Sequence, residues 1–151
     1  IGETRRNGWD VQFVADPLSQ VSLWGAYSRQ FSELVEPGAR DSVLRGNEID
    51  HLPGYTAKLG VDARPARNLT TSVSASMQGE YYLTTANTGE KFGDFLLVDL
   101  GLTYRLGRVT LGAQVNNLFD SYHEYVWNDG TTTLHAPGSG ISYNGTLAWE
   151  Y

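Results

Sequence analysis

Hydrophobic and polar residues alternate along seven stretches of this chain, the pattern of β-strands whose two faces meet different surroundings. The fifth stretch is the clearest, because Val98 and Leu100 flank Asp99 and the same alternation continues on both sides. The pattern predicts an all-β protein. The seven stretches are residues 9–15, 21–28, 55–63, 69–81, 96–106, 109–116 and 141–151.

The connections between these stretches alternate in length. A turn at residues 16–19, a link at 64–68 and a turn at 106–108 are short, whereas the segments 31–53, 82–94 and 121–140 are long and polar. An antiparallel up-and-down meander with its short turns at one end and its long loops at the other is typical of a transmembrane β-barrel. A compact soluble domain has no reason to sort its loops in this way.

The two faces of the predicted strands differ in a way that fits a membrane barrel. One face carries Val, Leu, Phe, Tyr and Trp, and the other carries small, polar and charged residues, although Trp24 falls on the polar face. In a membrane barrel the apolar face meets lipid and the polar face lines a wet lumen. Aromatic residues near the strand ends are predicted to form interfacial girdles: Trp9, Tyr27, Tyr55, Tyr81, Tyr104, Trp149 and Tyr151.

Composition narrows the choice of protein class. A formal net charge of -6 argues against a nucleic-acid partner, and the absence of cysteine excludes disulfides and thiolate metal sites. Aromatic residues reach 12% while charged residues are only 19%, which argues against disorder. No window approaches the roughly 20 apolar residues of a membrane-spanning helix, and barrel strands do not need one.

Four motifs follow one another along the chain. Residues 5–10 read Arg-Arg-Asn-Gly-Trp-Asp, and residues 46–53 read Gly-Asn-Glu-Ile-Asp-His-Leu-Pro before Leu-Gly-Val-Asp-Ala-Arg-Pro at 59–65. Residues 117–120 read Asn-Leu-Phe-Asp, with Tyr122 just beyond, and residues 135–140 read His-Ala-Pro-Gly-Ser-Gly before the last stretch. In combination these motifs resemble the C-terminal β-barrel portion of a TonB-dependent outer-membrane receptor, over essentially the whole chain.

The resemblance has two departures. Ser139 and Gly140 stand where such receptors more usually have arginine, which is expected to weaken a local salt bridge. Residues 5–10 stand where the family normally opens a strand with glycine, a hydrophobic residue and glutamate.

The resemblance implies that residues 1–151 are the last seven strands of a barrel of about 22 strands. The N-terminal plug, the TonB box and the earlier strands would then be missing, and the chain would be a fragment. Bacterial single-chain barrels have even strand numbers, so seven strands are not expected to close alone. The first stretch, residues 9–15, and the last, residues 141–151, are therefore predicted not to pair with each other.

The function implied by the resemblance is transport rather than catalysis. The intact receptor would sit in the bacterial outer membrane and import a scarce nutrient, such as a ferric siderophore or a cobalamin-like ligand, with TonB engaged through the missing N-terminal region. The other implied partners are outer-membrane lipid and, through the last strand and Tyr151, the barrel-assembly machinery. Two alternatives stay open: a structural or adhesive barrel, and a small soluble ligand-binding barrel without TonB-coupled transport.

Candidate ligand-binding residues are the aromatic and histidine side chains of the long loops, which suit an aromatic or metal-chelate ligand and could equally pack the loops together. They are Tyr82, Phe92, Tyr122, His123, Tyr125, Trp127 and His135. Charged residues on the polar face are expected to face the lumen, where they would hydrate it or contact the plug. They are Lys58, Asp62, Asp99, Arg105 and Glu150.

Catalytic chemistry and bound metals are not predicted. The sequence has no Gly-x-Ser-x-Gly elbow, and its three histidines, His51, His123 and His135, lie in the long loops without a recognisable metal-ligand spacing. Gly138 to Gly140 lack the following helix of a phosphate-binding loop, and Asn128-Asp129-Gly130 lacks the ligand pattern of a calcium loop. No enzyme activity, cofactor or resident metal ion is therefore expected.

Overall fold

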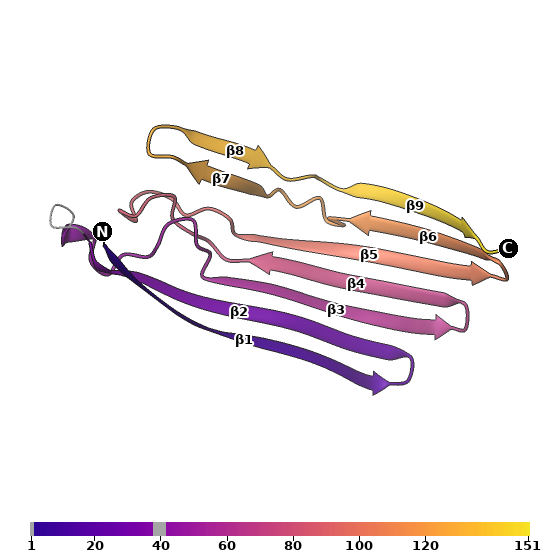
Figure 1. The fold of residues 1–151 in the computed structure, drawn as a ribbon. Helices are drawn as coiled ribbons and strands as arrows, with labels where there is room; N and C mark the ends of the chain where they lie inside the picture. Colours follow the sequence, from indigo (N-terminus) through magenta and orange to yellow (C-terminus); the bar gives the residue numbers. More distant parts are fainter. Residues whose placement is uncertain (1, 38–41) are drawn as a thin grey trace.

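The computed structural model describes residues 2–37 and 42–151. Their strands form one seven-stranded antiparallel sheet in the order β1-β2-β3-β4-β5-β6-β9, and a separate two-stranded hairpin, β7-β8 (Figure 1). The strands of the sheet are β1 (Glu3–Leu18), β2 (Val21–Glu36), β3 (Tyr55–Ala66), β4 (Leu69–Gln78), β5 (Phe95–Leu106), β6 (Val109–Asn116) and β9 (Ser142–Trp149). The hairpin consists of β7 (Glu124–Asn128) and β8 (Thr133–Pro137), and a short 3-10 helix, η1 (Ser42–Leu44), lies between β2 and β3.

The short and long connections lie at opposite ends of the sheet, as the sequence predicts (Figure 1). Two-residue turns at 19–20, 67–68 and 107–108 join β1 to β2, β3 to β4 and β5 to β6. Gly107 adopts a φ of 60°, which glycine tolerates without strain. The three long loops project from the other end, and Figure 1 shows the N-terminus at the loop end and the C-terminus at the turn end.

Within the described residues, almost no side chains pack over the apolar face of the sheet. Phe13 is 46% exposed and Leu147 is 74% exposed, and the only buried hydrophobic residues of the described chain, Tyr81 and Val126, lie in the loops rather than against the sheet. A soluble sheet of this size would bury such a face against a second layer. An uncovered apolar face of this extent is what a lipid-facing barrel wall presents.

Three of the predicted girdle residues meet on the apolar face near the loop end. The ring of Tyr27 lies 5.1 Å from that of Trp9 and 6.0 Å from that of Tyr55. Tyr81 does not belong to this row, and the prediction was wrong there. Strand β4 ends at Gln78, and Tyr81 forms an isolated bridge with Phe92 beneath the loops.

Several strand boundaries differ from the sequence-based expectation. Strands β1 and β2 extend to Glu3 and Glu36, well beyond the stretches with clear alternation. The chain does not turn at residues 16–19; β1 continues to Leu18 through a register shift after Ala15. A bulge on an edge strand tolerates Pro17, which cannot donate a hydrogen bond. The hairpin β7-β8 was not predicted, because its alternating residues were assigned to a loop.

Strands β1 and β9 are the two edges of the sheet, and within the described residues they do not pair with each other. The prediction that the first and last stretches stay apart is confirmed. Within the same residues, no helix is long and apolar enough to cross a membrane.

Candidate functional site

The pairing register brings the five predicted lumen-facing charges onto one face of the sheet. Lys58 pairs with Ser76, Asp62 with Ser72, and Asp99 with Ser74, so all three share the polar face. Arg105 follows on the same face and forms an ion pair with Glu150, with 2.6 Å between Nη2 and Oε1. This face is hollowed into a groove of about 360 Å³ whose lining includes Lys58, Asp99, Gln114 and Asn144.

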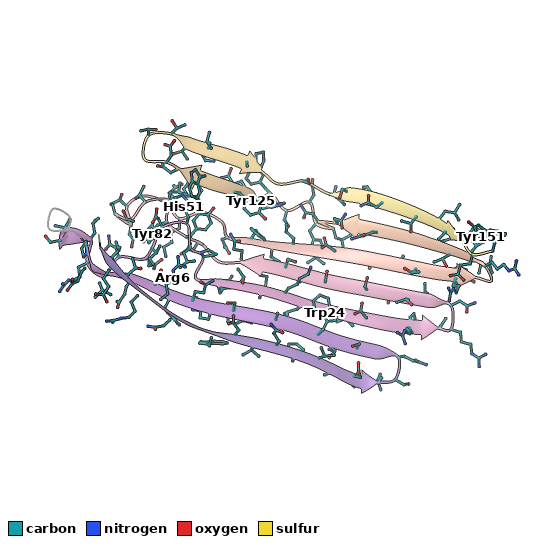
Figure 2. The ribbon with its side chains drawn as sticks, in the orientation of Figure 1. Arg6, Trp24, His51, Tyr82, Tyr125 and Tyr151 are labelled. Atoms are coloured by element: carbon teal, nitrogen blue, oxygen red, sulfur yellow. The ribbon has the colours of Figure 1, made fainter. Side chains whose placement is uncertain are left out.

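Trp24 departs from the alternation of apolar and polar residues because it forms a hydrogen bond on the polar face. Its indole Nε1 donates a hydrogen bond to Oδ2 of Asp62 at 2.9 Å. The ring lies over Gly60, where a Cβ atom would overlap it. The glycine opposite Trp24 therefore leaves room for its large ring on the polar face (Figure 2).

The three long loops converge at the outer end of the sheet and form the small buried core of the chain. Tyr81 is 6% exposed, and its hydroxyl donates to the carbonyl of Val126 at 3.1 Å and accepts from the Val126 amide at 3.3 Å. His51 lies between Tyr81 and Trp127, with ring centroids 6.2 and 4.2 Å away. Its Nε2 accepts the backbone amide of Asn128 at 3.2 Å. Each loop thus contributes to one packed contact.

Four aromatic or imidazole rings line the inner side of this loop assembly. Phe95 begins β5 on the polar face, and its ring centroid lies 5.5 Å from His123 and 6.2 Å from Tyr125. Trp127 lies two residues beyond Tyr125 on the same face of β7. Trp127 is 57% exposed and Tyr125 is 54% exposed. We call Phe95, His123, Tyr125 and Trp127 the aromatic platform. Exposed rings at this position offer stacking surfaces for a planar or metal-chelate ligand.

The remaining predicted loop residues lie elsewhere. Tyr82 lies beneath the ammonium group of Lys91, which is 4.5 Å from its ring centroid. Phe92 packs edge-on against His135 at 6.0 Å, and Tyr122 donates to Glu124. Figure 2 shows His51, Tyr82 and Tyr125 together at the loop end and Tyr151 at the other.

Two contributors to the loop assembly were missed by sequence reasoning. Phe95 was not selected because it directly precedes the predicted strand, although its position places it on the polar face with Asp99. His51 was not among the predicted ligand-binding residues, and its packing between two other loops is visible only in the folded chain.

A charged cavity of about 640 Å³ lies beside the loops, lined by the outer half of β2 and by the first two long loops. Lys91 lines it and pairs with Glu48 at 3.4 Å and Glu80 at 3.5 Å. Desolvation acts to lower the pKa of Lys91, but the neighbouring Glu48, Glu80 and Tyr82 outweigh it, so this pKa is raised. The ion pairs join two loops, and the cavity lining carries more carboxylates than cations.

The base of the third loop is closed by the Asn-Leu-Phe-Asp motif. Asn117 is 4% exposed, and its side-chain amide donates to the carbonyls of Ser121 and Ser139 at 2.9 and 3.2 Å while its oxygen accepts the Ser121 amide. Asp120 accepts the amide of Ile141 at 2.8 Å. The motif therefore ties the two ends of the loop together directly above the sheet.

Comparison with known proteins decides the family. A family model described as "TonB dependent receptor-like, beta-barrel" matches residues 1–118, more than three quarters of the chain. The chain belongs to this family of TonB-dependent receptor barrels. It is therefore part of a bacterial outer-membrane β-barrel.

A metal-pseudopaline receptor is among the relatives. The metal-pseudopaline receptor CntO of Pseudomonas aeruginosa is 30% identical over 164 residues, which cover 99% of this chain and 21% of that receptor. The chain thus spans about a fifth of the length of the curated relatives that it matches. These relatives are transport receptors and not enzymes.

Solved TonB-dependent receptors share the fold. The siderophore receptor PiuA from Acinetobacter baumannii superposes with a TM-score of 0.85 at 21% identity, over 100% of this chain and 22% of PiuA. The ferric citrate transporter FecA in its unliganded form gives 0.83 at 23% identity, over 97% of this chain and 24% of FecA. The all-β antiparallel meander is thus the fold of a TonB-dependent barrel wall.

No resident metal site is evident from the usual ligand types. In the part of the chain that the structure describes, no three His, Asp or Glu side chains come together as a metal-binding group.

Proposed function

We propose that the intact protein is a transport receptor that captures a scarce metal chelate at its outer loops and imports it with energy transmitted by TonB. The chain would supply the last seven strands of a barrel of about 22, with the plug, the TonB box and the earlier strands in the remainder of the protein. Its polar face would line the lumen, and residues such as Lys58 and Asp99 would meet the plug or its water.

The observation that carries this proposal is the convergence of the three long loops over the outer end of the polar face. The aromatic platform lies there, and its Tyr125 and Trp127 are more than half exposed. Phe95 packs against Tyr125 and His51 packs against Trp127, which holds both rings in place. Rings fixed by packing bind a rigid ligand without a large loss of side-chain freedom. The metal-chelate class is supported by the relative that is named a metal-pseudopaline receptor, and by the siderophore receptor and ferric citrate transporter that share the fold.

The test is uptake by the complete receptor in cells that lack their own copy. Radiolabelled ferric siderophores, divalent-metal chelates and cobalamin would be supplied under metal limitation, with and without a functional TonB. We expect accumulation of one metal chelate that disappears without TonB. Tyr125→Ala combined with Trp127→Ala should weaken its binding about thirtyfold, at roughly 1 kcal/mol per ring.

The matched control is Phe119→Ala, which removes a ring of the same loop that is 70% exposed and contacts no other aromatic ring in the described chain. This variant should bind as the unmodified receptor does. A correctly inserted receptor that accumulates no chelate, or accumulates it equally without TonB, would instead support a structural or adhesive barrel.

A further inference from the structure

Three donor side chains meet on the hairpin β7-β8 at a place separate from the aromatic platform. The hydroxyl of Tyr122 lies 2.9 Å from Oε2 of Glu124, and Nδ1 of His135 lies 3.1 Å from the same oxygen. Alternation places Tyr122 and Glu124 on one side of the chain, and His135 stands opposite Val126 on that side. The hairpin register therefore brings Glu124 and His135 together, and Tyr122 reaches Glu124 from the segment before β7.

These two hydrogen-bond distances also fall within the separations of neighbouring ligands around a transition metal. Nitrogen and oxygen ligands at about 2.0–2.2 Å from a metal lie about 2.9–3.4 Å from one another in octahedral or tetrahedral geometry. Imidazole and carboxylate donors suit Zn²⁺, Ni²⁺ and Cu²⁺, and Cu²⁺ binds such sites most tightly.

The hairpin holds the cluster in place while leaving it open to solvent. Val126, between Glu124 and the turn, is 3% exposed and anchored at its backbone by Tyr81. The ring of Phe92 supports His135 from one side. The side chains of His135 and Glu124 nevertheless remain 50% and 21% exposed, so an ion reaches them directly.

We propose that Tyr122, Glu124 and His135 form a binding site for a divalent first-row transition-metal ion on the outer surface of the receptor. The site takes the ion itself and does not depend on the proposed transport of a chelate.

Metal binding requires one net proton to leave. His135 binds the ion through Nδ1, with its ring proton on Nε2. Glu124 binds as its carboxylate. The Tyr122 hydroxyl loses its proton to solvent when its oxygen joins the metal.

The experiment is a titration with Cu²⁺ of the complete receptor, which is purified in detergent without any chelate. Calorimetry and electron paramagnetic resonance monitor the binding. We expect one tightly bound copper per receptor with hyperfine coupling to an imidazole nitrogen, and release of one proton. His135→Ala and Glu124→Gln should each weaken binding at least tenfold. His135→Ala should also remove the nitrogen coupling. Tyr122→Phe should weaken binding less and abolish the proton release.

Matched controls are Glu90→Gln and Tyr143→Phe, which change an exposed carboxylate and an exposed phenol outside the cluster and should bind copper as the unmodified receptor does. Unchanged heat-modifiable migration confirms that each variant has a folded barrel. Copper that binds equally well in His135→Ala and Glu124→Gln, or no stoichiometric copper at all, overturns the site. Neither result bears on chelate uptake.

Discussion

Asn117 shows how one residue of a linear motif acquires its role. Its φ is 50°, a left-handed conformation that asparagine tolerates better than most residues. In this conformation its side chain meets both ends of the third loop, and its backbone amide donates to Asp99 on the polar face at 2.9 Å. Asn117 therefore connects the barrel wall to the base of the loop that carries most of the aromatic platform.

Replacing Asn117 by alanine should loosen the loop base. The substitution removes the hydrogen-bond partner of the Ser121 amide and of the Ser121 and Ser139 carbonyls. It also places alanine at a positive φ, a conformation that alanine tolerates less well than asparagine. We expect a loss of about 2 kcal/mol or more in unfolding free energy. Urea unfolding of the complete receptor in lipid vesicles measures it.

Asn144→Ala is the matched control, because Asn144 is exposed on the polar face of β9. This variant should unfold at the same urea concentration as the unmodified receptor. Equal midpoints for Asn117→Ala and Asn144→Ala would show that the motif does not close the loop.

The hairpin β7-β8 is held by contacts that form only in the folded chain. It has its own strand pairing over five residue pairs and belongs to neither edge of the main sheet. The hydroxyl of Tyr81 and the imidazole of His51 connect it to the other two loops. These contacts predict a hairpin that is held as a fixed part of the receptor mouth.

Tyr81→Phe should release the hairpin without weakening the barrel. The substitution leaves the amide and carbonyl of the buried Val126 without their partner, at a cost of about 1–3 kcal/mol. Hydrogen exchange measured by mass spectrometry should therefore become faster in residues 124–137, while strands β3 to β6 keep their protection.

Tyr104→Phe provides the comparison, since Tyr104 is 43% exposed on the apolar face. Its exchange pattern should be that of the unmodified receptor. Unchanged protection of residues 124–137 in Tyr81→Phe would mean that the hairpin is held by other contacts.

Within residues 2–37 and 42–151 the main sheet is open, because its two edge strands have no further partner and its apolar face has no second layer. Strands β1 and β9 present unpaired backbone groups, and the apolar face carries exposed residues such as Phe13, Leu102 and Leu147. An open edge is a template for pairing with another strand, and an uncovered apolar face associates in water.

Residues 1–151 expressed alone should therefore not form a closed barrel. In detergent we expect oligomers of mixed size without the heat-modifiable monomer band of a barrel, and in plain buffer we expect aggregation. Size-exclusion chromatography with light scattering separates these outcomes from a monomer, and the complete receptor in the same detergent is the reference. A monodisperse monomer in detergent-free buffer would favour the soluble-barrel alternative.

The sequence by itself determined the sheet. Period-two alternation fixes which side chains share a face, and the sorted connection lengths fix an antiparallel meander, because both are local properties of the chain. The seven strands of the sheet, the residues of the polar face and the separation of the first strand from the last were all predictable. The limits of β1 and β2 were not, since their outer ends lack alternation and are held by pairing with each other.

Only the tertiary structure decided how the loops are arranged. Tyr81, His51 and Val126 are 30 to 75 positions apart in the sequence, and no local pattern indicates that they share one core. Packing between loops separated the predicted ligand residues into an aromatic platform with His123 and Tyr125, and a distinct cluster with Tyr122 and His135. Such contacts depend on where the barrel wall holds the ends of each loop, which alternation along a single strand does not encode.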